Sequence, residues 1–71
     1  MNKSGVLTGK IKFFKQESGY GFIINDDTNE EHFLHFGDLV DTKAHLKQRD
    51  AVRYEIGEGK KGPKAINVEK I

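Results

Sequence analysis

The sequence predicts an all-β fold, a five-stranded antiparallel barrel, from three observations. β-branched and aromatic residues occur in short runs separated by Gly, Asp and Asn, as expected of strands joined by turns. The 71 residues suffice for one domain and contain no internal repeat. Short strands without a covering helix cannot bury both faces of an open sheet, whereas closing the sheet removes its edges and encloses a small core.

The expected strands occupy residues 6–14, 20–24, 32–36, 51–56 and 65–68. Residues 17–19 and 25–29 between them are rich in types that favour turns. In residues 51–56, Val, Tyr and Ile alternate with Arg and Glu, a period of two that is typical of a strand. Residues 41–48 could hold a helical turn but are expected to form a long loop, and residues 57–62 are expected to form a flexible loop.

Ten aliphatic side chains are candidates for the barrel core, and they suffice for a barrel of this size. They are Val6, Ile11, Ile23, Leu34, Leu39, Leu46, Val52, Ile56, Ile66 and Val68. The domain is expected to comprise residues 6–71, with residues 1–5 as a loose tail.

Composition excludes several classes of protein. The chain has no cysteine, which excludes disulfides and thiolate zinc sites and favours a reducing compartment. No apolar run approaches the roughly 20 residues that cross a bilayer, and the first residues lack the apolar stretch of a secretion signal. We therefore expect a monomeric cytoplasmic protein, not associated with membranes, that binds a partner rather than catalysing a reaction and needs no cofactor.

The net charge of +1 conceals an uneven distribution of charge. Residues 1–20 carry four lysines and one acid, residues 21–41 six acids and no Lys or Arg, and residues 42–71 eight bases and four acids. Such a pattern can give the basic face that a polyanion requires, although ordinary solvated loops would give the same counts.

The second and third expected strands carry rings at alternate positions. If Ile23 and Leu34 fill the core, the alternating side chains face outward. With Phe13 from the first strand, the outward set contains Tyr20, Phe22, Phe33 and His35. Unpaired bases stack on such rings while lysines attract the phosphates, so this pattern favours a single-stranded nucleic acid. The alternative is a bulge that breaks the alternation and places some rings in the core.

Four segments of the chain resemble motifs of the bacterial cold-shock proteins. Gly9–Phe14 is similar to the opening strand of that family, and Ser18–Ile23 resembles its first RNA-binding motif. His32–Phe36 resembles the second motif, and Gly62–Val68 matches the closing Gly-Pro-x-Ala-x-Asn-Val. The four occur in the order and at the spacing of the family and cover nearly all of residues 6–71.

The resemblance implies an OB-type, Greek-key barrel that binds single-stranded RNA or DNA with low sequence specificity. It also implies a role as an RNA chaperone or as a regulator of transcription or translation. By position, the stacking residues would be Phe13, Tyr20, Phe22, Phe33, His35 and Phe36, with Phe14 at the rim. By position Lys12 would contact the phosphates, and Lys10, Lys60 and Lys64 are further candidate phosphate-binding cations.

The chain departs from the family pattern at several positions. Phe13 replaces a tryptophan, Ser18 a lysine and His32 an aliphatic core residue. Lys43 falls where an aromatic residue is usual, in a loop about one residue short. These departures predict a weaker or differently tuned binder.

A bulge or bend is also expected in the first strand, between Ile11 and Phe13. The two residues have the same parity along the strand, but Ile11 is assigned to the core and Phe13 to the surface.

Other constellations in the sequence are weaker. His32 and His35 lie three apart on a strand, so they face opposite ways and cannot chelate one metal ion. Gly57–Gly62 fits a dinucleotide-binding fingerprint, but Pro63 and a strand follow it instead of a helix. No catalytic constellation has a cleft to occupy. The alternative function is a small barrel that docks a peptide or a subunit on the same aromatic patch.

Overall fold

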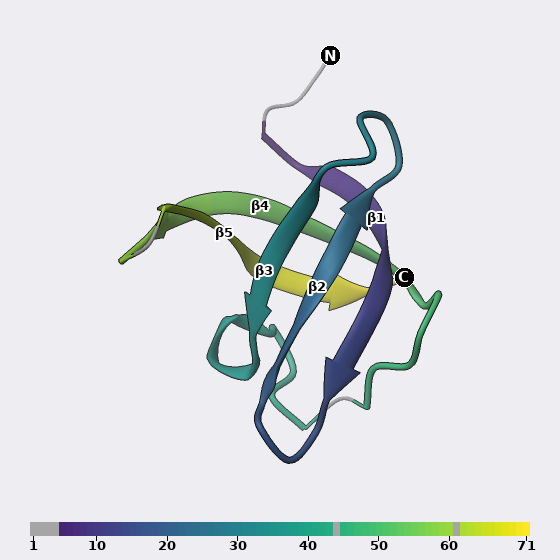
Figure 1. Cartoon of the computed structure of the whole chain (residues 1–71), viewed down its shortest axis with the longest axis vertical. Helices are drawn as coiled ribbons and strands as arrows, with labels where there is room; N and C mark the ends of the chain where they lie inside the picture. The colour runs from purple at the N-terminus through teal and green to yellow at the C-terminus, as the bar shows by residue number, and fades with distance from the viewer. Residues whose placement is uncertain (1–4, 44, 61) are drawn as a thin grey trace.

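Five strands close into one barrel, which confirms the predicted architecture (Figure 1). The computed structural model describes residues 5–43, 45–60 and 62–71, so the expected tail lies almost wholly outside the described residues. The elements are β1 (Leu7–Lys15), β2 (Tyr20–Asn25), β3 (Glu31–His35), the 3-10 helix η1 (Phe36–Asp38), β4 (Ala51–Gly59) and β5 (Gly62–Lys70). Within the described part of the chain, no helix is long and apolar enough to cross a membrane.

The barrel order is β1-β2-β3-β5-β4, and one of its seams is parallel. β3 pairs with β5 in parallel, whereas the pairs β1–β2, β2–β3, β1–β4 and β4–β5 are antiparallel. The single parallel pair is where the otherwise antiparallel barrel closes. The reason is geometrical: strand directions cannot alternate all the way around a closed ring with an odd number of strands.

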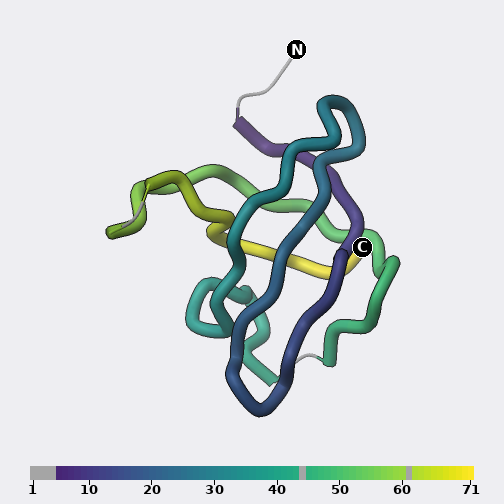
Figure 2. The backbone as a smooth tube through the Cα atoms, in the orientation of Figure 1, coloured from purple at the N-terminus to yellow at the C-terminus, as the bar shows by residue number. Residues whose placement is uncertain are grey.

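The predicted flexible loop at residues 57–62 is wrong, because the strands continue through most of it. β4 and β5 stay paired to the end of their hairpin, with Gly57 opposite Lys64 and Gly59 opposite Gly62. A Cβ atom on Gly57 would lie 2.8 Å from the side chain of Ile66, so glycine makes room for this packing. The paired hairpin extends from one side of the barrel (Figure 2).

The expected bulge in β1 is confirmed. Ile11 pairs with Ile23 and Phe13 pairs with Phe22, which leaves Lys12 as the extra residue. Ile11 is therefore buried, while Phe13 lies half-buried on the outer face.

Gly21 allows β1 and β2 to approach closely beyond this bulge. A Cβ on Gly21 would lie 2.8 Å from the Cα of Phe14 and closer still to the carbonyl oxygen of Phe13. Gly21 itself is buried, so the chain that approaches it is the backbone of β1.

Most of the predicted core is observed. The confirmed members are Ile11, Ile23, Leu34, Leu39, Leu46, Val52 and Val68. The prediction is wrong for Val6 and Ile56, which are 51% and 40% exposed. Val6 lies just before β1, and Ile56 lies on the hairpin. Tyr54 and Ala65 are core residues that the prediction omitted.

A second bulge, in β5, explains why Ala65 rather than Ile66 is a core residue. Arg53 pairs with Glu69 but Glu55 pairs with Ile66, so β5 holds one residue more than β4 at this point. Asn67 there has a positive φ of 50°, which turns the strand. Ala65 before the bulge therefore faces inward, and Ile66, a predicted core residue, is only half-buried.

A polar contact inside the barrel explains the histidine at position 32. The Asn25 side-chain amide donates to the Tyr54 hydroxyl over 2.9 Å, and that oxygen lies 3.0 Å from Nδ1 of His32. Asn25 also accepts hydrogen bonds from the backbone N–H groups of Asp27 and Thr28. A tyrosine hydroxyl thus gives His32 a polar partner and ties the core to the β2–β3 turn.

Replacing Tyr54 with phenylalanine should lower the free energy of unfolding by about 1–3 kcal/mol, because the buried Asn25 amide loses its acceptor. Burial raises the pKa of Tyr54 above its usual value of 10.0, with nearby carboxylates adding to the effect. The folded state then holds the phenolic proton more tightly than the unfolded state does. The stability from this difference is complete below pH 10 and is lost as the pH rises toward the folded-state pKa.

Urea denaturation between neutral and alkaline pH measures both effects. Tyr54→Phe should show the lower stability at neutral pH and a shallower loss above pH 10 than the parent protein. Tyr20→Phe, which changes a half-buried outer-face ring, is the control and should keep the parent's alkaline loss. Equal stability of Tyr54→Phe and the parent would contradict the role of the hydroxyl.

Candidate nucleic-acid interface

A row of side chains crosses the barrel over four neighbouring strands. Phe13 of β1 is opposite Phe22 of β2, Phe22 is opposite Phe33 of β3, and Phe33 is opposite Lys64 of β5. The ring centroids of Phe13 and Phe22 are 5.5 Å apart, and those of Phe22 and Phe33 are 5.8 Å apart. Strand register therefore produces a line of touching rings with a cation at its end.

A second row lies beside the first. It consists of Lys15, Tyr20 and His35, which are opposite one another on β1, β2 and β3. Tyr20 joins the rows, since its ring stacks on Phe33 at 6.0 Å and meets Phe13 edge-on at 6.1 Å. We call Phe13, Tyr20, Phe22, Phe33 and His35 the aromatic face.

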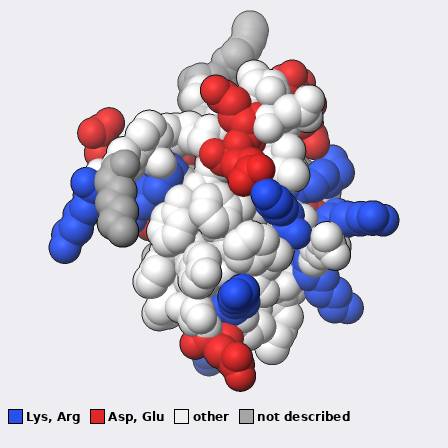
Figure 3. All heavy atoms as spheres, viewed as in Figure 1, with Lys and Arg blue, Asp and Glu red and all other residues white. Residues whose placement is uncertain are grey.

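The aromatic face points outward because its neighbours along the strands fill the core. Ile23 and Leu34 are both 0% exposed, so the alternating rings of β2 and β3 lie on the outside. None of these rings belongs to the core, and the alternative that places some of them there is wrong. Figure 3 shows a broad uncharged surface over β2 and β3, with basic residues on both sides of it and another that projects from its lower part; acids gather near the β2–β3 turn and again at the bottom of the view.

Two further phenylalanines do not belong to the aromatic face. Phe36 begins η1 rather than ending β3; it is 47% exposed, and its ring contacts His35. Its N–H donates to the carbonyl oxygen of Gly19, and its ring lies over that glycine. Phe14, the predicted rim residue, is half-buried and packs against the core.

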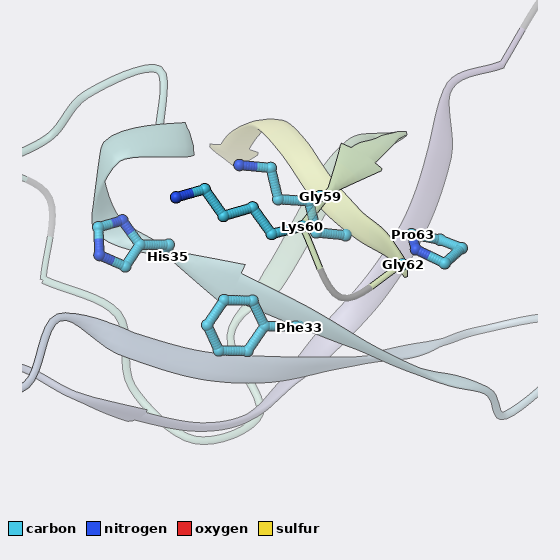
Figure 4. Close-up of a pocket in the computed structure, with 7 residues that line it drawn as sticks. Phe33, His35, Gly59, Lys60, Gly62 and Pro63 are labelled. Carbon is cyan, nitrogen blue, oxygen red and sulfur yellow. The ribbon is translucent and has the colours of Figure 1, made fainter.

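A cleft of about 460 Å³ lies between β3 and the β4–β5 hairpin. Rings and cations line it together: Phe33, His35, Gly59, Lys60, Gly62, Pro63 and Lys64. In Figure 4, Phe33 and His35 come from β3, while Gly59, Lys60, Gly62 and Pro63 come from the hairpin. The cleft extends the aromatic face toward two of the four predicted phosphate-binding lysines.

Three of those four lysines form ion pairs with carboxylates. The pairs are Lys10–Asp26 at 3.0 Å, Lys12–Glu31 at 2.9 Å and Lys64–Asp38 at 3.0 Å. The hydrogen bond from Lys10 also holds the pKa of Asp26 below its usual value. The first two pairs lie beside the acidic β2–β3 turn.

Lys15 is a cation of this face that the prediction missed. It has the same parity as Phe13 beyond the bulge, is exposed, and makes no salt bridge with the described residues. Strand alternation would have indicated it, since the expected bulge already separated Phe13 from Ile11.

The two histidines have different surroundings. His32 shares the inward parity of Leu34 and contacts Tyr54, whereas Nδ1 of the exposed His35 accepts the N–H of Gly37. In the residues that the structure covers, no group of three or more side chains is arranged to hold a metal ion.

The two other departures from the family motifs, Ser18 and Lys43, are exposed, and Ser18 lies in the β1–β2 turn.

Comparison with known proteins gives the same family as the motifs. Residues 7–71 match the model of the 'Cold-shock' DNA-binding domain. The chain is 39% identical to the Cold shock-like protein of Aquifex aeolicus over 61 residues, 84% of this chain and 87% of that one. It is 38% identical to the Major cold shock protein of Micrococcus luteus over 67 residues, 93% of this chain and 100% of that one.

The barrel is also similar to a solved structure, drosophila Unr CSD456, with a TM-score of 0.75 and 23% sequence identity. The match covers 93% of this chain but 26% of the other, and it bears on the fold alone. Sequence, motifs and barrel agree: the chain belongs to the cold-shock domain family and binds nucleic acid in the manner of that family.

Proposed function

We propose that the aromatic face binds unpaired bases of single-stranded RNA or DNA with low sequence specificity. The observation that supports this most strongly is the continuous line of three rings that ends at Lys64. Each ring offers a flat surface to a base, and stacking on aromatic side chains contributes roughly 1–3 kcal/mol per base. A double helix hides those base surfaces, so the ligand must be single-stranded.

Each predicted residue has a role in this proposal. The bases stack on the aromatic face and on Phe36. The phosphates lie near Lys60 and Lys64 beside the cleft and near Lys15 at the other edge. Lys10 and Lys12 already pair with Asp26 and Glu31, so a phosphate competes with those carboxylates for the two ammonium groups. Stacking tolerates any base, which accounts for the low specificity.

The biological role in the proposal is that of an RNA chaperone or a regulator of transcription or translation. A protein that binds single strands without strong base preference keeps transcripts from pairing with themselves. The proposal includes a monomer that acts by binding rather than catalysis, in the cytoplasm, where transcripts are available as ligands.

A single-stranded oligonucleotide should bind more tightly than the same oligonucleotide annealed to its complement. Anisotropy of a labelled strand, alone and as a duplex, measures both affinities, and poly-U and poly-T strands compare RNA with DNA. Equal or tighter binding of the duplex would contradict stacking and leave only electrostatic attraction.

The salt dependence tests the alternative of a peptide-binding barrel, which the exposed rings of Phe33 and Phe36 would also suit. Phosphate contacts on a single strand steepen the slope of log affinity against log salt by about 0.7 each. An apolar peptide on the same rings would bind nearly independently of salt.

A further inference from the structure

We propose that the carboxylate of Asp38 competes with the nucleic-acid phosphate for Lys64, and thereby sets the affinity and salt dependence of the aromatic face. This inference rests on the proposed function, since it concerns the same surface. It makes Asp38 a residue that tunes binding, although Asp38 does not belong to the aromatic face.

Lys64 lies where a strand stacked on the rings would pass. It is opposite Phe33 in the parallel seam, and it lines the cleft together with Phe33 and His35. The aliphatic part of its side chain runs over Gly59, where a Cβ would lie 3.2 Å from the lysine Cδ. Its ammonium group ends 3.0 Å from Oδ2 of Asp38.

This ion pair is less exposed than the other two at the site. The side chains of Lys64 and Asp38 are 31% and 21% exposed, against 51% and 34% for Lys10 and Asp26. Water screens a partly buried pair less, so the carboxylate neutralises Lys64 more effectively than the acids of the β2–β3 turn neutralise their partners.

The backbone on both sides of Asp38 is anchored. Before it, the N–H of Phe36 donates to the carbonyl oxygen of Gly19 over 2.8 Å. After it, Leu39 is buried, and the N–H of Val40 donates to Val68 of β5 over 2.8 Å. The short helix η1 is therefore held against β5, with the Asp38 carboxylate next to Lys64.

A phosphate that approaches Lys64 meets a cation already neutralised and a fixed negative charge beside it. The phosphate must compete with Asp38 for the ammonium group, so Lys64 contributes less net attraction while Asp38 is ionised. Partly exposed ion pairs are weak enough for such an exchange. Without the carboxylate, the same lysine would act as a full phosphate contact.

The test is Asp38→Asn, which keeps the shape of the side chain and removes its charge. Binding of oligo-T should become about two- to fivefold tighter at low salt, a gain in the range of an exposed ion pair. The slope of log affinity against log salt should steepen by about 0.7, one phosphate contact on a single strand. In a background of Lys64→Gln, Asp38→Asn should have a much smaller effect, because the cation for which the carboxylate and the phosphate compete is gone.

The matched control is Glu69→Gln, which changes the net charge equally. Glu69 pairs with Arg53 at 2.7 Å, and neither residue belongs to the two rows or the cleft. If Glu69→Gln tightens binding as much as Asp38→Asn does, net charge is the cause and the inference is wrong. An unchanged salt slope for Asp38→Asn would also overturn it.

Two additional measurements separate the possible failures. Thermal denaturation of every variant, with Asp38→Ala added, shows whether the η1 carboxylate is needed for folding. If both Asp38 variants fail to fold, the carboxylate has a structural role and the inference is overturned. Phe22→Ala is measured beside them. If Phe22→Ala weakens binding and Asp38→Asn does nothing, only this inference fails; if Phe22→Ala binds normally, the proposed function fails.

Discussion

Replacing Phe22 with alanine is expected to weaken the binding of a single-stranded oligonucleotide by about 1–3 kcal/mol, or roughly fivefold to 150-fold. Phe22 is the middle ring of the row and touches both Phe13 and Phe33. Because it lies on the outer face, the thermal midpoint should change little. Titration of a labelled oligo-T, with a thermal melt of the same sample, measures both quantities.

Phe14→Ala is the matched control, since Phe14 lies next to Phe13 but packs against the core. It should lower stability and leave the affinity of the folded protein nearly unchanged. Phe33→Ala should behave like Phe22→Ala. If Phe22→Ala unfolded the domain while its folded fraction bound normally, the aromatic face would be a structural surface.

Replacing Ile23 with alanine should have the opposite effect, a loss of about 2–5 kcal/mol in the free energy of unfolding. Ile23 is 0% exposed and pairs with Ile11 on β1, so truncation leaves a cavity in the centre of the barrel. Domains of this size have a total stability of only a few kcal/mol, so a large fraction of the variant should be unfolded at 37 °C.

Urea denaturation measures this loss in free energy of unfolding, at about 10–20 °C, where domains of this kind are typically most stable. Ile23→Val is the conservative control and should cost about 0.5–1.5 kcal/mol. At saturating oligonucleotide the bound protein should regain a folded signal, because the ligand binds the folded state only. A loss below about 1 kcal/mol for Ile23→Ala would mean that the barrel closes over the cavity.

Phe22 and Ile23 are neighbours in the sequence, and the sequence alone separates their roles. Strand alternation is local: once Ile23 is assigned to the core, Phe22 must face outward. The same logic required a bulge between Ile11 and Phe13, which the register confirms. The strands and most of the core followed from such local patterns, and so did the set of outward rings.

Alternation failed where distant strands alter the register or the burial. Ile66 has the parity of a core residue only if β5 is regular, and the bulge at Asn67 arises where β5 pairs with β4. Ile56 has the parity of Val52 and Tyr54 but lies on the hairpin beyond them. The hairpin itself was predicted as a loop because its glycines suggest flexibility, whereas pairing across the strands keeps it extended.

The barrel and the rings of the aromatic face could be predicted from the sequence, because strand parity and turn residues act over a few positions, and the family followed from the resemblance of four motifs. The ion pairs of the lysines, in contrast, are seen in the folded chain alone. Asp38 and Lys64 are distant in the chain, and the parallel seam between β3 and β5 brings them together. An ion pair depends on the distance between two charges in space, and no periodicity in the sequence encodes that distance.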